Sequence, residues 1–263
     1  PTTPQIWLSL NKGKNMTRRV QSFLWKSIHK GHKIGHFWKY TGLADTHMLC
    51  AQCRVPTESL DHILFEGSAS GQDTIWEFAK QIWTTIGLSW PRPHMGLILG
   101  TNLVSVYTPD RKKELTGHSR LLRIILSESA YLIWLVGCKW RVGDEHDPHK
   151  FPKKETIEDR WLFILNKRLH YDRILTDRKS YGEKALNAKL VERTWALLFK
   201  TELSSGDYPL DWITNLGVLV SIGRARRPPG RNRQPSRMTQ LSGHHPSRHL
   251  VPNPPRVSHC LLP

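Results

Sequence analysis

Two cysteines and one histidine in the first quarter of the chain could together bind a zinc ion. Cys50 and Cys53 are separated by two residues, and eight residues lie between Cys53 and His62. Thiolate sulfur and imidazole nitrogen are ligands that Zn²⁺ prefers, and structural sites fill four tetrahedral positions with them. A C-x2-C-x8-H-x4-C pattern would have its last cysteine where this chain has Gly67. The sequence therefore predicts a degenerate zinc knuckle with weakened zinc binding. A reduced structural cysteine pair is the alternative.

The fourth ligand of this predicted site has several candidates. His47 precedes Cys50 by three residues and is the first substitute, followed by Glu66 and by Cys138 if folding brings it near. A water molecule is the remaining option and would leave a weaker, more open site. The ligand bonds of a structural zinc site contribute on the order of 10 kcal/mol to folding, so the loss of one thiolate weakens zinc binding.

Catalytic patterns are missing from the sequence. It contains no Gly-rich phosphate loop, no G-x-S-x-G nucleophile elbow and no H-E-x-x-H metalloprotease motif. The only local acidic cluster, residues 144–147, is more typical of a solvated loop than of a cation site. We therefore expect that the chain is not an enzyme, and an active nuclease is disfavoured.

The net charge of +17 is concentrated at the two ends of the chain. Of the 39 Lys and Arg residues, eight lie in 1–44 and eight in 224–263, and neither segment contains an Asp or Glu. The middle segment, 45–223, therefore holds 23 basic and all 22 acidic residues. Basic segments without acids favour a polyanionic partner, because binding phosphates releases counterions. A solvated basic surface without a partner is the alternative.

An amphipathic helix is predicted over 15–30, capped by Asn15 or Thr17, with apolar residues at helical spacing and cations mostly off that face. Basic and aromatic residues, including Phe37, Trp38 and Tyr40, then precede the predicted knuckle. They could contact phosphates and stack on bases, or the rings could belong to the core. The predicted nucleic-acid-binding residues are Arg18, Arg19, Lys26, Lys30, Lys33 and Lys39.

The predicted fold class is mainly α: a helical domain with a small degenerate zinc knuckle and a disordered basic C-terminal tail. Four segments are expected: a basic N-terminal helical segment 1–44, the knuckle 45–71, a helical domain 72–223 and the tail 224–263. The tail has eight Pro, eight Arg and no acid. Such a segment buries too little apolar surface to offset the conformational entropy that it would lose on folding. Apolar periodicity predicts helices over 73–86, 118–140, from a cap at Thr156 onward and 181–203, and a short strand over 216–222.

Four cysteines, only two of them close in sequence, do not resemble a disulfide framework, so an intracellular, nuclear or cytoplasmic location is expected. No secretory signal is visible. The most apolar stretch, 130–138, is too short to span a bilayer, and no membrane association is expected. The first residue is Pro1 rather than Met, which indicates a piece of a longer protein.

Several motifs together resemble one family. The chain is similar, through about residue 223, to the C-terminal region of fungal non-LTR retrotransposon polyproteins, the reverse transcriptase zinc-binding region that follows the polymerase and RNase H domains. The residues that carry this resemblance are 7–10 (WLSL), 17–29 (TRRVQSFLWKSIH), 35–38 (GHFW), Cys50, Cys53, 58–64 (ESLDHIL), 127–134 (SESAYLIW), 166–169 (NKRL), Asp172, 212–213 (WI) and 217–220 (GVLV).

The resemblance implies a set of zinc ligands and a function. Its ligands would be Cys50, Cys53, His62 and a cysteine at the position of Gly67. It implies that the polymerase and RNase H carboxylates belong to segments upstream of Pro1. The expected function is a non-catalytic, nucleic-acid-binding region of a reverse transcriptase/RNase H polyprotein, with RNA or RNA/DNA as the partner. One alternative is a decayed structural relic without selected activity. Another is a fragment that is known only by the reverse transcriptase/RNase H activity of its parent polyprotein.

Overall fold

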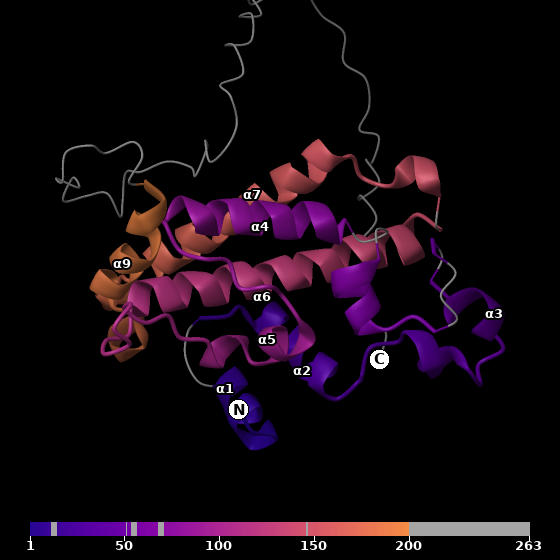
Figure 1. Ribbon diagram of the computed structural model, residues 1–263, viewed down its shortest axis with the longest axis horizontal. Helices are drawn as coiled ribbons and strands as arrows, with labels where there is room; N and C mark the ends of the chain where they lie inside the picture. The colour runs from indigo at the N-terminus through magenta and orange to yellow at the C-terminus, as the bar shows by residue number, and fades with distance from the viewer. Residues whose placement is uncertain (12–14, 51, 54–56, 68–70, 146, 200–263) are drawn as a thin grey trace, which may run out of the picture. The chain divides into compact units, whose positions relative to one another are not determined.

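The computed structural model describes residues 1–11, 15–50, 52–53, 57–67, 71–145 and 147–199. These residues are mainly helical (Figure 1), which confirms the predicted mainly-α class. Among them, β pairing is limited to one isolated antiparallel bridge between Tyr107 and Glu114. The chain divides into the units 1–222 and 223–263, and every described residue belongs to the first. The predicted strand 216–222 and the predicted disordered tail lie outside the described residues.

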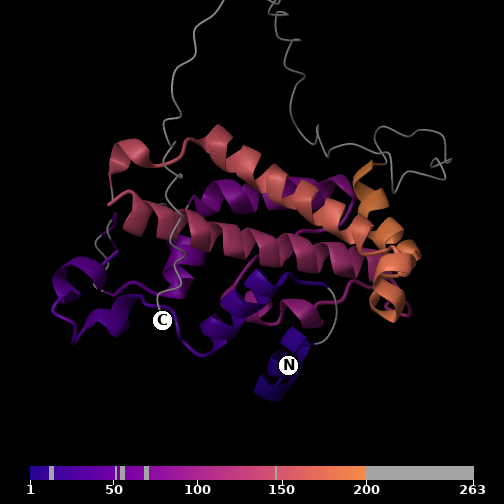
Figure 2. The same ribbon diagram turned by 180° about the vertical axis from the view of Figure 1, so that it is seen from behind.

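The longest helix, α6 (Thr116–Cys138), lies at the centre of the fold. It packs against α4 (Gln72–Thr85), α7 (Lys154–Ile174) and α9 (Ala188–Phe199); both views show α4 and α7 beside it and α9 at the end where it begins (Figures 1 and 2). Its apolar residues occur on more than one side, so they remain out of water only if several helices cover them. The helix predicted over 118–140 is therefore the core helix, as its composition indicates.

Helix α6 is longer than its most apolar stretch. It continues into a π-helical turn, η5 (Lys139–Gly143), and the 28 residues Thr116–Gly143 are long and apolar enough to cross a membrane. The stretch 130–138, which is too short for a bilayer by itself, is therefore only part of a longer apolar helix. However, 67% of its most apolar window is buried inside the protein. Burial in a protein core accounts for the same composition, so the helix is only weak evidence of a membrane span.

The N-terminal residues form two helices on the side of α6 opposite to α4 and α7 (Figures 1 and 2). Helix α2 (Arg18–Ile28) begins at Thr17, whose Oγ1 accepts a hydrogen bond from the Val20 amide at 3.4 Å. The sequence predicted this helix and its cap. The preceding helix, α1 (Thr3–Asn11), was not predicted. Both contact neighbouring elements: α1 packs on α2 and η4 (Thr101–Leu103), and α2 packs on α5 (Met95–Leu99) and α6.

Two predicted helices need correction. Helix α7 begins at Lys154 with Lys153 as its N-cap, so Thr156 lies in the first turn and does not cap the helix. The helix predicted over 181–203 is interrupted, because Gly182 has a positive φ of 52° that only glycine adopts easily, and α9 starts later. The remaining elements are η1 (Gly35–Trp38), α3 (Ala44–His47), η2 (His62–Glu66), η6 (Pro148–Lys150), α8 (Arg178–Tyr181) and η7 (Gly182–Lys184).

Charged side chains are buried where α6, α7 and α9 meet. The Asp172 carboxylate, which is fully buried, lies 2.7 Å from Arg120 Nη1 and 3.2 Å from Arg168 Nε. The indole N–H of Trp195 donates to the same carboxylate at 2.8 Å. Charges inside a core are tolerated when they are paired and hydrogen-bonded in this way. The cluster therefore links α6, α7 and α9 through one buried carboxylate.

A second buried carboxyl, that of Glu128 on α6, is near this cluster and titrates unusually. Burial raises the pKa of Glu128 from 4.5 to about 7, the positive charge of Arg168 opposes that shift, and the negative charge of Asp172 adds to it. Between pH 4.5 and about 7, the Glu128 carboxyl is therefore mostly protonated in the folded protein and mostly ionised in the unfolded chain. Because the folded state binds more protons there, the free energy of unfolding falls as pH rises from about 4.5 to 7.

The substitution Glu128→Gln tests this pH dependence, since glutamine is close to a protonated glutamate in shape and cannot ionise. Relative to Glu128→Gln, the wild-type protein should lose on the order of 3 kcal/mol of unfolding free energy between pH 4.5 and pH 8. Urea unfolding at several pH values measures this difference. The control is Glu183→Gln, which replaces an exposed carboxylate. Its unfolding free energy should change with pH in the same way as that of wild type. A pH-independent difference between wild type and Glu128→Gln would contradict the prediction.

Candidate metal centre

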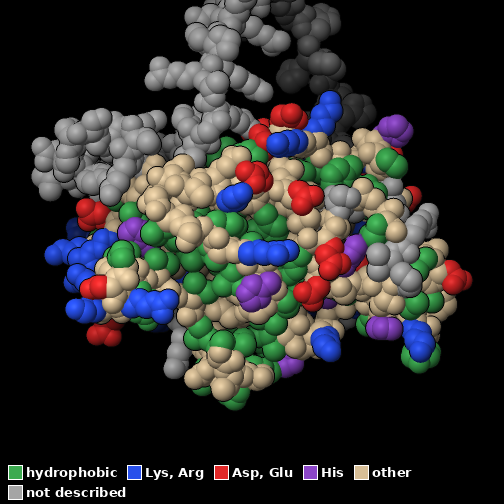
Figure 3. All heavy atoms as spheres, viewed as in Figure 1, with side chains coloured by type: hydrophobic (Ala, Val, Ile, Leu, Met, Phe, Trp, Pro, Cys, Tyr) green, Lys and Arg blue, Asp and Glu red, His purple; other side chains and the backbone are tan. Residues whose placement is uncertain are grey.

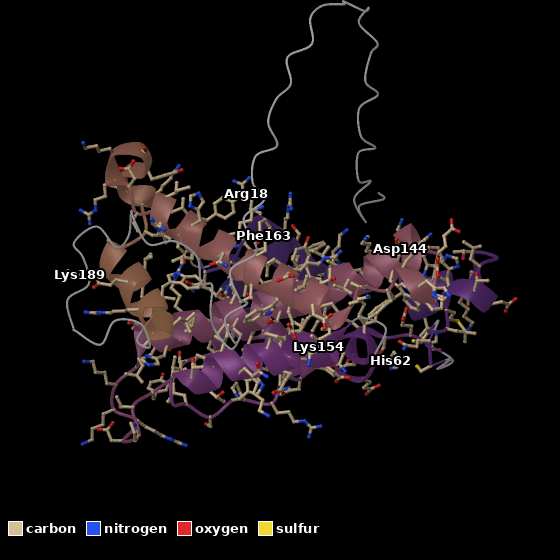
Figure 4. The ribbon with its side chains drawn as sticks, turned by 90° about the horizontal axis from the view of Figure 1, so that it is seen from above. Arg18, His62, Asp144, Lys154, Phe163 and Lys189 are labelled. Carbon is tan, nitrogen blue, oxygen red and sulfur yellow. The ribbon has the colours of Figure 1, made fainter. Side chains whose placement is uncertain are left out.

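The structure brings Cys50, Cys53 and His62 together, as the sequence predicted. Their ligand atoms all lie within 4.8 Å of one another, and Cys53 Sγ is 3.1 Å from His62 Nε2. In a tetrahedral zinc site, neighbouring sulfur and nitrogen ligands are roughly 3.5 Å apart. Small movements would therefore bring all three atoms onto one ion. We call these three residues the Cys/His group; Figure 4 shows the labelled His62 beside the sulfur atoms.

Local hydrogen bonds and core packing hold the histidine half of the group. The His62 amide donates to Ser59 Oγ at 3.0 Å, which starts the π-helical turn η2. Leu64 in this turn is fully buried, and its carbonyl accepts a hydrogen bond from the Trp76 indole at 2.8 Å. Because η2 packs on both α4 and α6, the imidazole projects from a fixed support rather than from a free loop.

A charged contact fixes the cysteine half of the group to the end of the core helix. Arg141, in the turn η5, forms an ion pair with Glu58 and donates to the carbonyls of His47 and, at 3.1 Å, Leu49. Burial lowers the pKa of the Arg141 guanidinium, and the Cys50 thiol opposes that shift.

Glu66 orients His62 instead of serving as the fourth ligand. Its Oε2 lies 3.2 Å from His62 Nδ1, on the side of the imidazole away from Cys53. A carboxylate accepts a hydrogen bond from Nδ1–H, which leaves the lone pair of Nε2 free to bind a metal. The spacing of four residues between His62 and Glu66 is the sequence signal that could have revealed this role.

The other predicted substitutes also lie outside the Cys/His group. His47 instead packs its ring on Trp38, with centroids 4.9 Å apart, and its Nδ1 is 2.7 Å from Thr46 Oγ1. Cys138, at the end of α6, is half-buried and is likewise not part of the group. Within the described residues, the protein thus supplies three convergent ligands.

Gly67 occupies the place from which a fourth ligand could reach the group. It is buried, and a Cβ added to it would lie 3.1 Å from His62 Nε2. Its backbone angles, φ −87° and ψ 125°, are ones that any residue adopts. A cysteine here could therefore direct its sulfur at the same point as Cys53, with a shift of a few tenths of an ångström in His62.

The predicted nucleic-acid-binding residues lie on α2 and the segment after it. Arg18, Arg19, Lys30, Lys33 and Lys39 are exposed and Lys26 is half-buried. The aromatic residues of this segment do not join the core: Phe37 is 49% exposed and Tyr40 is 88% exposed. Lys33 Nζ lies 5.7 Å from the centre of the Phe37 ring, and Lys39 Nζ lies 5.2 Å from that of Tyr40.

A further basic group was missed by the sequence analysis. Arg111, Lys112 and Lys113 are all exposed in the loop before α6. In Figure 3, Lys and Arg side chains gather on the viewed face at the end of the molecule where α6 begins. Counting charge over the whole of 45–223 concealed this local cluster, because the acids of the segment, including the flanking Asp110 and Glu114, balance it. A shorter counting window would have found it.

The hydrogen bond from His62 to Glu66 should tune zinc affinity. Replacing Glu66 by alanine removes the acceptor, and loss of such a partner commonly weakens metal binding by about 10–100-fold. Competition with a zinc chelator of known affinity measures the change. The control is Asp61→Ala, which removes an exposed carboxylate one residue before His62. Equal losses in the two variants would show that overall charge, rather than orientation of His62, is responsible.

The substitution Gly67→Cys should restore the missing ligand. Zinc affinity is expected to rise by about tenfold or more, since the four ligands of a structural zinc site together contribute roughly 10–16 kcal/mol. Gly67→Ala is the matched control, because it adds the Cβ without the thiol. The same chelator competition applies. If Gly67→Cys binds zinc no more tightly than Gly67→Ala, position 67 does not face the metal.

Comparisons with known proteins add no outside evidence about this site. No protein-family model, curated protein or solved structure matches the chain. The candidate centre is therefore defined by its own geometry: two thiols and one imidazole that converge, a carboxylate that orients the imidazole, and a buried glycine beside them.

Proposed function

We propose that this chain is a non-catalytic region that binds RNA or RNA/DNA on its basic N-terminal segment, with zinc held by Cys50, Cys53 and His62. We further propose that it corresponds to the zinc-binding region of a retrotransposon reverse transcriptase/RNase H polyprotein, as its motifs suggest. The observation that carries the proposal is the exposure of five of the six named cations in a segment that contains no acid.

Electrostatics favour a polyanion at this segment. With no Asp or Glu in 1–44, nothing within the segment neutralises Arg18, Arg19 or their neighbours by local ion pairing. Such cations keep their full attraction for phosphates and release counterions when they bind. The exposed rings of Phe37 and Tyr40 beside Lys33 and Lys39 provide the aromatic surfaces that single-stranded nucleic acids use.

Zinc would have a structural role in this function. The basic segment touches the stretch between Cys53 and His62: Gly35, at φ 49°, approaches the Glu58 backbone so closely that a side chain would not fit. Glu58 in turn pairs with Arg141 beside Cys50. A bound ion would hold two thiolates and His62 in place, and thereby support the segment that carries Lys33 and Lys39.

A second possibility is a structural relic without selected activity, and Gly67 is the observation that favours it. A site that had lost its function would be free to lose a ligand, whereas a selected site would keep enough affinity to retain metal. Zinc content after prolonged dialysis of purified protein separates these cases. One zinc per chain retained through dialysis argues against a relic, and metal-free protein that folds equally well argues for it.

Salt dependence provides the direct test of nucleic-acid binding. Affinity for a labelled single-stranded RNA should fall steeply with salt, with a slope of roughly 0.7 per phosphate contact in a log–log plot. The double variant Arg18→Gln/Arg19→Gln should reduce that slope by about 1.4. Fluorescence anisotropy between about 50 and 200 mM salt measures both values.

A charge-matched control locates the binding surface. Lys112→Gln/Lys113→Gln removes the same number of exposed charges from the other basic group. It should lower the overall attraction slightly and leave the slope nearly unchanged. If only the Lys112/Lys113 variant reduces the slope, nucleic acid binds at the loop before α6 and not at the basic N-terminal segment, which would contradict the proposal. Binding that does not depend on salt would contradict it altogether.

A further inference from the structure

Three aromatic rings from two helices form a contiguous exposed cluster at the N-terminus. The centre of the His29 ring lies 4.4 Å from that of Trp7 and 4.3 Å from that of Trp25. Trp7 is 37% exposed, Trp25 is 49% exposed, and His29 is also exposed. We call Trp7, Trp25 and His29 the ring platform. Large aromatic surfaces are costly to leave in water, so a contiguous exposed group of them indicates a binding surface.

The ring platform is held rigidly by contacts beneath it. Leu10 of α1 is buried in the core, and its carbonyl accepts a hydrogen bond from Gln21 Nε2 of α2 at 3.2 Å. Asn102 Nδ2 donates to the Ser9 carbonyl at 2.7 Å and ties α1 to η4. Because α1 is fixed on both sides, Trp7 meets His29 in a defined position. A preformed surface of this kind loses little entropy when a ligand binds.

Cations lie along the same face of α2 as the rings. At 100° per residue, Arg18 and Trp25 lie about 20° apart around the axis of α2, and Arg19 and Lys26 lie about a quarter turn from them. Arg18 and Trp25 are two turns apart, about 10 Å along the axis. The face thus offers flat apolar surfaces and positive charges side by side, with no acid in 1–44 to oppose an anion.

We propose that the ring platform stacks on unpaired bases and gives this chain a preference for single-stranded over double-stranded nucleic acid. This inference rests on the proposed function, because it names the form of nucleic acid that the same basic segment recognises. Unpaired bases expose their π-faces to aromatic side chains, whereas the bases of a duplex cover those faces by stacking on one another. Phosphates next to a base stacked on Trp25 would then meet Arg18 and the flanking cations.

The test compares two labelled single strands of equal length, one with normal bases and one abasic in its central part. Both carry the same phosphates, so they differ only in the groups that can stack. The wild-type chain of 263 residues should bind the base-bearing strand about tenfold more tightly at a given salt concentration. Trp25→Ala should abolish this preference and leave both the affinity for the abasic strand and the salt slope unchanged.

Further variants separate stacking from loss of structure. Trp25→Phe keeps a ring and should restore most of the preference. Phe163→Ala removes an aromatic side chain that is 64% exposed on α7, outside the ring platform, and should behave as wild type. Circular dichroism melting of each variant checks that α2 remains folded.

The outcomes distinguish this inference from the proposed function on which it rests. If wild type binds both strands equally and with steep salt dependence, the stacking role is overturned and the proposed function stands. The same conclusion follows if folded Trp25→Ala keeps the preference for the base-bearing strand. If neither strand binds in a salt-dependent way, both proposals fail.

Discussion

Apolar side chains occur around most of the circumference of α6, and such a helix is stable in water only where neighbouring helices cover it. This requirement places α4, α7 and α9 against it. It also brings charged residues into the interior, where they need partners. The Asp172 carboxylate pairs with Arg120 and Arg168 and accepts a hydrogen bond from the Trp195 indole, so it links α6, α7 and α9.

The Cys/His group depends on the same helix. Arg141 follows directly from the end of α6 and binds both Glu58 and the carbonyls that precede Cys50, while Leu64 after His62 enters the core. Contacts within the protein therefore position both halves of the group. Metal binding to such a site adds to the stability of the fold, because the unfolded chain has no comparable arrangement of ligands.

Much of the fold and the convergence of the ligands could be predicted, because they depend on local sequence. Helical spacing of apolar residues identified α2, α4 and α6, and Cys50, Cys53 and His62 are close enough in sequence to meet. The short helix α1 was missed because it contains no charged residues that would mark a polar face opposite its apolar residues.

The other missed features depend on residues far apart in the chain or on exposure. The contact of Arg141 with Glu58 and the approach of Trp7 to His29 require the folded positions of separate helices. The exposure of Phe37 and Tyr40 also follows from packing, since aromatic residues are equally compatible with a core. Gly67 was predicted only in part. The sequence identified it as the position of the missing ligand, and the structure shows that a side chain there would face His62 Nε2.

The central claim is that two thiolates and one imidazole of this chain hold a metal, with no third protein sulfur. X-ray absorption at the zinc edge of the zinc-loaded protein tests it most directly. The account predicts two sulfur ligands at about 2.3 Å and two nitrogen or oxygen ligands at about 2.0–2.1 Å, one of them the His62 imidazole. A zinc ion with no sulfur ligands, or with three or more, would contradict it.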